Sequence, residues 1–435
     1  MLDRPLGSPA GKSAEQTMNF PLIDILRGFA ALSVVVFHVI AHFNWIDFPT
    51  SGPLVWFRIG DIGVDLFFVI SGFVIALSAF ARLSRGRFMD FARSFSRARL
   101  ARIVPLYYLT CLIFLVFVEP GLVFVPDIWK QVLSHGLFLH SWFLMHQGGI
   151  NGPNWSVSVE MQFYALMLLV APWLRRANWL LIGAGAVTIA WSWRAAVFLL
   201  VDPNGQWGTF PVFVYTTELP GMLDEFAAGI LLARLILSPK GRALLAWARS
   251  RPWILPGAAA MIVTIALQIY WHNTTYWNSG PMVVAFKSVL AIASAMVLLS
   301  ACALQCPMVV RLTAPLQYLG TISYGIYLWH LPVILALKRV SWVDGPRALP
   351  SVIVLTLLFA SLSWHFMERP LMRRFGSRVR GITDDGTTEE CGTRDIPAGR
   401  EAGMSTAVES GPGVSGQTES VPAVVLARGS GAGEP

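Results

Sequence analysis

The chain has 435 residues, of which 55% are hydrophobic and only 13% are charged; its mean hydropathy is +0.58 and its net charge is +8. About a quarter of the residues in a soluble globular domain are charged, so this composition excludes a water-soluble protein and predicts an integral membrane protein. The 27 Phe and 17 Trp strengthen the prediction, because a water-facing surface does not hide so many aromatic side chains.

Apolar stretches recur along the chain, and a helix needs about 20 such residues to cross the hydrocarbon core of a bilayer. The sequence therefore predicts an all-α, polytopic fold with about ten transmembrane helices. The predicted spans are residues 20–42, 61–81, 102–124, 155–174, 179–201, 220–238, 253–271, 282–303, 317–338 and 349–368. A shorter apolar piece near 131–145 is expected to be interfacial or re-entrant. The first span has Asp and Arg at its start and no small-residue cleavage site after it, so no signal peptide is predicted.

Basic residues gather in alternate loops. Seven arginines lie between residues 82 and 102, after the second span, and further Lys or Arg follow the fourth, sixth, eighth and tenth spans. Because cytoplasmic loops carry the excess of Lys and Arg, both termini are predicted to be cytoplasmic. Residues 1–18 are then a cytoplasmic N-terminal segment and 19–380 the membrane domain. Residues 381–435 are rich in Gly, Ser and Thr, with nine acidic and three basic residues, and are expected to form a disordered cytoplasmic tail.

The first predicted span, IDILRGFAALSVVVFHVI, contains Asp24, Arg27 and His38. Arg27 and His38 are eleven helical steps apart, which places them about 20° apart on one face and about 16 Å apart along the axis. Asp24 lies three residues before Arg27 and can pair with it. Ionisable side chains inside a span are functional candidates because they are costly to bury. The structural alternative is a snorkelling Arg and a hydrogen-bonded, buried His.

Three later segments also carry polar residues within or beside predicted spans. They are Asp65 and Ser71 in GVDLFFVISGFVI, Trp155, Ser156 and Glu160 in NGPNWSVSVEMQFY, and Tyr324 and His330 in SYGIYLWHLPV. Each has a structural alternative as well; a His followed by Pro, for example, can bond carbonyls that a kink has freed. The predicted topology places His38, Asp65 and Glu160 in the outer half of the bundle, and Arg27 with the Arg-rich loop in the inner half.

This division suggests a reaction in which the donor is bound in the inner half of the bundle and the acceptor hydroxyl is deprotonated in the outer half. A His is the usual general base for a hydroxyl, and a carboxylate can orient it; the candidate catalytic residues are His38, Asp65 and Glu160. Guanidinium groups bind phosphate oxygens through a planar fork; the candidates to bind an anionic donor are Arg27, Arg99 and Arg102. Further candidate pocket residues are Asp24, Ser71, Trp155, Ser156, Tyr324 and His330. For the arginines the alternative is topology alone, which does not explain the spacing Arg99-x-x-Arg102.

Seven segments, in order, resemble the membrane acyltransferase 3 family, which includes O-acetyltransferases of lipopolysaccharide, exopolysaccharide and nodulation factors. They are LRGFAALSVVVFH, GVDLFFVISGFVI, RARLARIVPLYYL, NWSVSVEMQFY, DEFAAGILLA, ISYGIYLWHLPV and MERPL. The family's Arg, ten residues and His fall on Arg27 and His38, and its basic pair falls on Arg99 and Arg102. Met161 stands where many relatives have a second Glu, so no carboxylate pair is expected beside Glu160.

The resemblance implies a ten-helix membrane enzyme that takes an acyl group, usually acetyl, from cytoplasmic acyl-CoA. The acceptor would be a hydroxyl of a glycan or lipid-linked saccharide on the outer side of the bacterial plasma (inner) membrane. No bound cofactor, no metal and no nucleic-acid partner is expected. Two other hypotheses remain open: a transporter, because midplane charges suit a solute pathway, and a metal site using His38 and His42, which lacks a third ligand.

Overall fold

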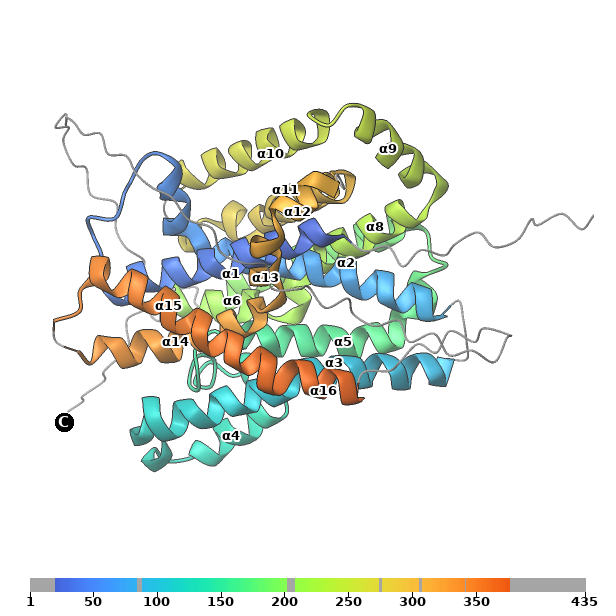
Figure 1. Ribbon diagram of the computed structural model, residues 1–435. Helices are drawn as coiled ribbons and strands as arrows, with labels where there is room; N and C mark the ends of the chain where they lie inside the picture. Colours follow the sequence, from blue (N-terminus) through green and yellow to red (C-terminus); the bar gives the residue numbers. More distant parts are fainter. Residues whose placement is uncertain are drawn as a thin grey trace, which may run out of the picture.

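The computed structural model describes residues 20–83, 88–201, 208–273, 276–304, 307–340 and 342–375, so the predicted segments 1–18 and 381–435 lie outside the described residues. Every regular element in the described ranges is a helix, which confirms the all-α class. Figure 1 shows the long helices running side by side, with α9 and α10 at one edge of the bundle and α4 at the opposite edge.

Eight helices in the described ranges are long and apolar enough to cross a membrane, or nine if one bent pair is counted as a single span. Their elements are α1 (Pro21–His42), η1 (Pro53–Ile62) with α2 (Gly63–Leu83), α3 (Phe88–Ile113) with η2 (Phe114–Val118), α5 (Asn154–Leu174), α6 (Trp179–Leu200), α10 (Ile254–Trp271), α11 (Gly280–Ala303), the bent pair α13 (Ala314–Thr321) and α14 (Ser323–Lys338), and α15 (Gly345–Ser363) with η7 (Trp364–Glu368) and α16 (Arg369–Phe375).

The remaining elements are short. They are η3 (Pro120–Phe124), α4 (Ile128–Gly136), η4 (His140–Trp142), α7 (Phe210–Thr216), η5 (Leu219–Met222), α8 (Leu223–Leu237), α9 (Pro239–Ser250), η6 (Tyr276–Asn278) and α12 (Pro307–Leu312). The predicted span 220–238 corresponds to the end of η5 followed by α8, and the 15 residues of α8 cover only about 22 Å. The tenth span therefore stays a prediction from the sequence.

The Arg-rich segment after the second span differs from its prediction as a loop. From Phe88 it belongs to α3, which continues for 26 residues into the apolar part of the bundle. Phe88, Phe91 and Phe95 recur at helical spacing, and their neighbouring ring centroids lie 6.0 and 5.4 Å apart. This apolar stripe anchors the first turns of α3, so Arg99 and Arg102 lie inside a helix and not at its mouth.

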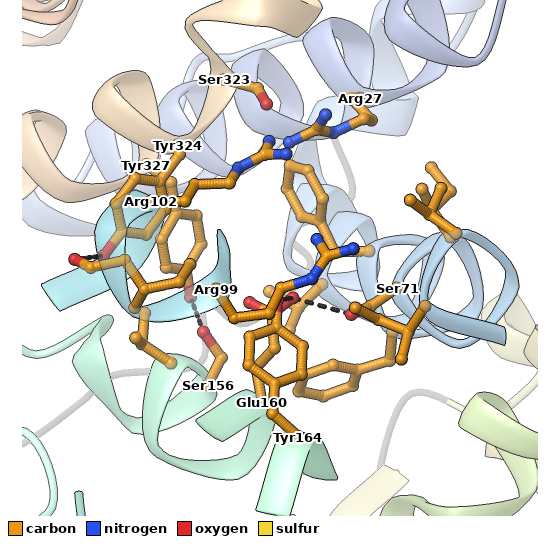
Figure 2. A pocket seen from close by; sticks show the side chains of 18 residues that line it. Arg27, Ser71, Arg99, Arg102, Ser156, Glu160, Tyr164, Ser323, Tyr324 and Tyr327 are labelled. Atoms are coloured by element: carbon orange, nitrogen blue, oxygen red, sulfur yellow. Dashed lines mark hydrogen bonds between the residues drawn. The ribbon is translucent and has the colours of Figure 1, made fainter. Parts of the chain in front are cut away.

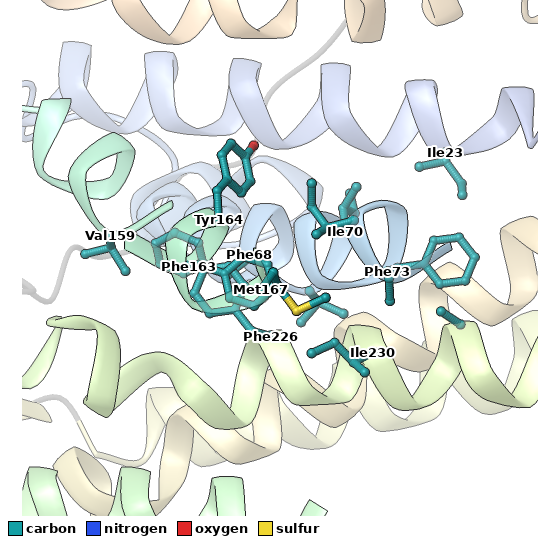
Figure 3. Packing of buried hydrophobic residues seen from close by; sticks show 14 of the residues in the cluster. Ile23, Phe68, Ile70, Phe73, Val159, Phe163, Tyr164, Met167, Phe226 and Ile230 are labelled. Atoms are coloured by element: carbon teal, nitrogen blue, oxygen red, sulfur yellow. The ribbon is translucent and has the colours of Figure 1, made fainter. Parts of the chain in front are cut away.

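Part of the apolar core is formed where α2 packs on α8. Gly72 of α2 faces the backbone of Phe226, and Gly229 of α8 faces the backbone of α2, so neither position has room for a Cβ. Small residues of this kind allow membrane helices to approach closely. Figure 3 shows Phe68, Phe163 and Phe226 packed together at this contact, and the rings of Phe163 and Phe226 stack with centroids 3.9 Å apart.

The pair α13–α14 bends by 67° between Thr321 and Ser323. On its α13 side, the bend packs against α1: a Cβ added to Gly28 would lie 2.9 Å from the Leu319 Cβ and 3.0 Å from the Gly320 nitrogen. The bend therefore turns the first residues of α14 into the centre of the bundle.

Candidate functional site: an arginine-lined cavity between the helices

A cavity of about 90 Å³ lies where α1, α2, α3, α5 and α14 meet (Figure 2). Its walls are apolar except for ten side chains: Arg27, Ser71, Arg99, Arg102, Ser156, Glu160, Tyr164, Ser323, Tyr324 and Tyr327. Seven of the twelve residues predicted for the site thus meet around one space, although they come from segments almost 300 residues apart in the sequence.

The three arginines give the cavity an excess of positive charge. Asp24 lies 3.7 Å from the Arg27 guanidinium, which confirms the predicted pair. Asp24 is also the one carboxylate within ion-pair distance of any of the three arginines in the described ranges. Arg99 lies 5.7 Å above the ring centroids of both Phe95 and Tyr164, and its Nε is buried without a hydrogen-bond partner. A buried, unpartnered guanidinium N–H is a donor available to an anionic ligand.

Glu160 also lines the cavity, where two hydroxyl groups fix its carboxylate. Its Oε1 accepts hydrogen bonds from the Ser71 hydroxyl at 2.7 Å and from the Tyr164 hydroxyl at 2.5 Å. The sequence-based expectation separated Glu160, in the outer half, from the arginines in the inner half; the structure brings them into one cavity. The reason is that α3 is helical from Phe88, which carries Arg99 and Arg102 deeper than a loop would.

The tyrosines close another side of the cavity. Tyr327 lies 2.7 Å from Ser156, hydroxyl to hydroxyl, and the Tyr324 hydroxyl donates to the carbonyl of Ile103 at 2.8 Å. Trp155 does not line the cavity; its ring packs against Phe68 and Phe213 in the adjacent core.

His38 and His330 lie beside the cavity and do not form its wall. Their ring centroids are 4.9 Å apart, across the contact of α1 with α14. The His38 Nδ1 donates to the carbonyl of Val34 at 2.9 Å, and the His330 Nδ1 donates to the carbonyl of Tyr327 at 2.6 Å. Tyr327, which does line the cavity, therefore connects the histidine pair to it.

Asp65 also lies outside the cavity wall. It accepts from Lys287 of α11 at 2.6 Å, and Glu225 of α8 lies 3.9 Å from the same ammonium group. Beside this pair, Arg194 of α6 is ion-paired with Asp224. These five buried residues, called the charge cluster below, join α2, α6, α8 and α11.

One more buried acid lies between α7 and η5. Glu218 is fully buried, and its Oε2 accepts from Ser141 at 3.1 Å while its Oε1 has no hydrogen-bond partner. Burial raises the pKa of this carboxyl to about 8, although the hydrogen bond from Ser141 lowers it. Glu218 is therefore mainly protonated at neutral pH.

Several residues of the site were not predicted from the sequence: Ser323, Tyr164, Tyr327 and, in the charge cluster, Lys287, Arg194, Asp224 and Glu225. Tyr164 follows Glu160 by four residues, so helical spacing could have placed it on the same face. Tyr327 could have been found in the same way, three residues before His330. Within the described residues, no three of the His, Cys, Asp and Glu side chains are grouped as metal ligands.

A bundle of membrane-spanning helices around a buried, arginine-lined cavity defines a polytopic membrane protein. Comparison with known proteins gives the family. Residues 20–365 match the acyltransferase domain of the membrane acyltransferase 3 family. The chain belongs to this family, which confirms the resemblance found in its motifs.

Curated relatives agree with this assignment. The chain is 26% identical to the peptidoglycan O-acetyltransferase OatA of Listeria monocytogenes over 84% of its own length and 58% of that protein. It is 28% identical to the putative peptidoglycan O-acetyltransferase YrhL of Bacillus subtilis, over 82% and 56%. It is 27% identical to the acyltransferase MdmB of Streptomyces mycarofaciens, over 86% and 97%. The chain thus spans little more than half the length of the first two. No solved structure matches it significantly.

Proposed function

We propose that the protein is a membrane O-acyltransferase that moves an acyl group, acetyl in the simplest case, from cytoplasmic acyl-CoA to a hydroxyl of a cell-surface or exported glycan. The observation that carries the donor part is the cavity itself, where Arg27, Arg99 and Arg102 converge with no carboxylate but Asp24 in ion-pair range in the described ranges. OatA of Listeria monocytogenes, named above, is a peptidoglycan O-acetyltransferase, and YrhL of Bacillus subtilis carries the same name as a putative one, which favours a glycan acceptor.

In this proposal the arginines bind the phosphates of the donor, and the thioester extends towards the histidine pair. His38 is suited to act as general base because its Nδ1–H is bonded to a carbonyl, which leaves the lone pair on Nε2 in the neutral ring. Glu160, held by Ser71 and Tyr164, lines the same cavity and offsets part of the positive charge of the arginines, although it lies outside ion-pair distance of all three. In this proposal Asp65 holds helices together, because its carboxylate is already paired with the Lys287 ammonium group.

The proposal places the protein in the bacterial plasma membrane with both termini cytoplasmic. The basic segment around α9 is then cytoplasmic and the α14–α15 connection is external. Cysteines introduced at Arg249 and Trp342, both exposed, would be labelled by a membrane-impermeant maleimide from opposite sides of intact cells and inverted vesicles. Labelling of both from the same side would contradict this topology.

The activity is tested with purified protein in lipid nanodiscs, radiolabelled acetyl-CoA and peptidoglycan fragments. The expected result is release of CoA thiol together with alkali-labile acetyl esters on the fragments, detected by mass spectrometry. His38→Ala should lower the rate roughly 10²- to 10⁴-fold, the usual loss when a general base is removed. His272→Ala is the matched control, because the His272 Nδ1 makes the same bond to a carbonyl, that of Gln268, at an exposed position. Solute uptake without cleavage of acetyl-CoA would support a transporter instead.

A further inference from the structure

The histidine pair at the contact of α1 and α14, His38 and His330, contains a buried hydrogen-bond acceptor that has no donor. His330 is fully buried, and its Nε2 has no hydrogen-bond partner. A carbonyl can only accept, so the Nδ1 of His330 must carry the hydrogen in its bond to Tyr327, and Nε2 then carries a lone pair. A buried acceptor without a donor is destabilising and requires an explanation.

The same reasoning applies to the partner ring. The Nδ1 of His38 donates to Val34, so the His38 Nε2 also carries a lone pair. In each ring Nδ1 is turned back to its own helix, which directs Nε2 away from that helix, and the two rings lie 4.9 Å apart between the two helices. No hydrogen bond joins the two Nε2 atoms in this structure. A proton added to the His38 Nε2 would supply the donor that the His330 Nε2 lacks, once the two rings turn to within hydrogen-bond distance.

The surroundings favour a shared proton over an isolated charge. The titratable side chains that face the pair are His42, whose ring centroid is 6.1 Å from that of His38, and Tyr327, 5.7 Å from that of His330. Neither supplies the negative charge that would stabilise an imidazolium, and the next ring on the α2 side of Tyr327 is Phe67. A proton on His38 is therefore stabilised chiefly by the lone pair of His330.

We propose that His330 is a positioning residue that accepts a hydrogen bond from protonated His38 and so holds the proton taken from the acceptor hydroxyl. This inference rests on the proposed function. The hydroxyl proton passes to the His38 Nε2, the hydroxyl oxygen bonds to the acyl carbon, and the carbon–sulfur bond of the thioester breaks. The His38 Nε2–H then donates to the His330 Nε2 until the thiolate of the leaving CoA takes the proton. The products are the ester and the CoA thiol, and the pair ends neutral.

Kinetics provide one test. His330→Phe should lower kcat roughly 10- to 100-fold, the loss of one hydrogen bond to a charged group, while acyl-CoA affinity stays unchanged. His330→Gln, whose amide oxygen can accept, should recover part of the rate. The acidic limb of the pH–rate profile should move to lower pH in His330→Phe, because the imidazolium of His38 is no longer stabilised. His272→Phe is the control and should change none of these. A purely structural His330 would lower the amount of folded protein and leave the pH profile in place.

The second test does not need activity. Solid-state NMR of protein labelled with ¹⁵N-histidine reports the protonation of each ring nitrogen. At alkaline pH both Nδ1 atoms should carry hydrogen and both Nε2 atoms should not, and on acidification the Nε2 signals of His38 and His330 should shift together. In His330→Phe the His38 signal should shift alone, at lower pH. Independent titration of the two rings would overturn the inference. Absence of acetyl transfer by the wild-type protein would refute the proposed function. The NMR titration would still decide whether the two histidines share a proton.

Discussion

Two regions of the bundle bury charged side chains, and they differ in how these charges are paired. In the charge cluster the basic groups contact acids directly: Lys287 binds Asp65 at 2.6 Å, and Arg194 is paired with Asp224. In the arginine-lined cavity three guanidinium groups surround a hollow, and within the described residues only Asp24 is in ion-pair range. Charged side chains that pair with one another hold helices together. Arginines that lack a carboxylate partner around a cavity are suited to bind a ligand of opposite charge.

The largest effect is expected from the cavity. Arg99→Ala combined with Arg102→Ala should weaken acyl-CoA binding roughly 10²- to 10⁴-fold, since each hydrogen bond to a charged group contributes about 1.5–3 kcal/mol. The double Arg→Lys variant should recover only part, because an ammonium group lacks the bidentate fork. Calorimetry in nanodiscs measures the affinity. Unchanged binding in the Ala variant would show that these arginines serve topology alone.

A comparable change in the charge cluster should affect folding instead. Lys287→Met leaves Asp65 and Glu225 buried without their cation and should reduce the free energy of unfolding by about 3–5 kcal/mol. Adding Asp65→Asn should recover part of that loss. The control is Lys130→Met, which breaks an ion pair with Asp127 of similar length, 2.9 Å, at an exposed position and should matter by about 1 kcal/mol or less. Thermal unfolding in nanodiscs measures all three variants. Equal melting points for Lys287→Met and wild type would remove the distinction between the two regions.

A third effect is a dependence of stability on pH that arises outside both regions. The raised pKa of Glu218, about 8, means that the folded protein keeps a proton that the unfolded chain loses above its ordinary pKa near 4.3. Stability should therefore fall as pH rises from about 5 to about 8 and change little above that range. Glu218→Gln cannot ionise and should flatten the curve of melting temperature against pH. A wild-type slope that persists in the Gln variant would assign it to other groups.

The smallest expected effect concerns the orientation of Glu160. Tyr164→Phe and Ser71→Ala each remove one donor to its Oε1 and should each reduce kcat/KM by a factor of about 5 to 10, corresponding to about 1 kcal/mol. Removing both should cost more than either change alone, because the carboxylate then loses the hydrogen bonds from both hydroxyl groups. Steady-state rates with acetyl-CoA and a glycan fragment measure the effect. No change in the double variant would show that the cavity works without a fixed Glu160.

Much of the fold could be predicted from the lengths of the apolar segments, because every membrane-spanning helix must cross the same thickness of hydrocarbon. The face shared by Arg27 and His38, and the Asp24–Arg27 pair, follow from helical geometry alone. The helical start of α3 could not be predicted by counting charges, since its arginines resemble a cytoplasmic loop. Only the spacing of its phenylalanines distinguishes a helix that continues beyond the span.

The partners of buried charges were beyond sequence reasoning for a different reason. Asp65 was expected to serve catalysis because the predicted topology places it in the outer half of the bundle with His38, and its partner Lys287 lies 222 residues away on α11. No periodicity within either helix encodes that contact; it depends on how α2, α8 and α11 pack. The family motifs located the arginines, His38 and Tyr324, whereas the contacts of Tyr164 and Tyr327 became visible only in the folded chain.

The break between α13 and α14 has an electrostatic consequence. Because the chain bends by 67° there, α14 begins in the interior, and Ser323 and Tyr324 of its first turn line the cavity. No side chain caps this helix start, and the Ser323 hydroxyl is buried without a partner. The first backbone N–H groups of a helix carry about half a positive charge. A span without a break would place this end at the membrane surface; the broken one adds its field to that of the three arginines, with a charge that no change of pH removes.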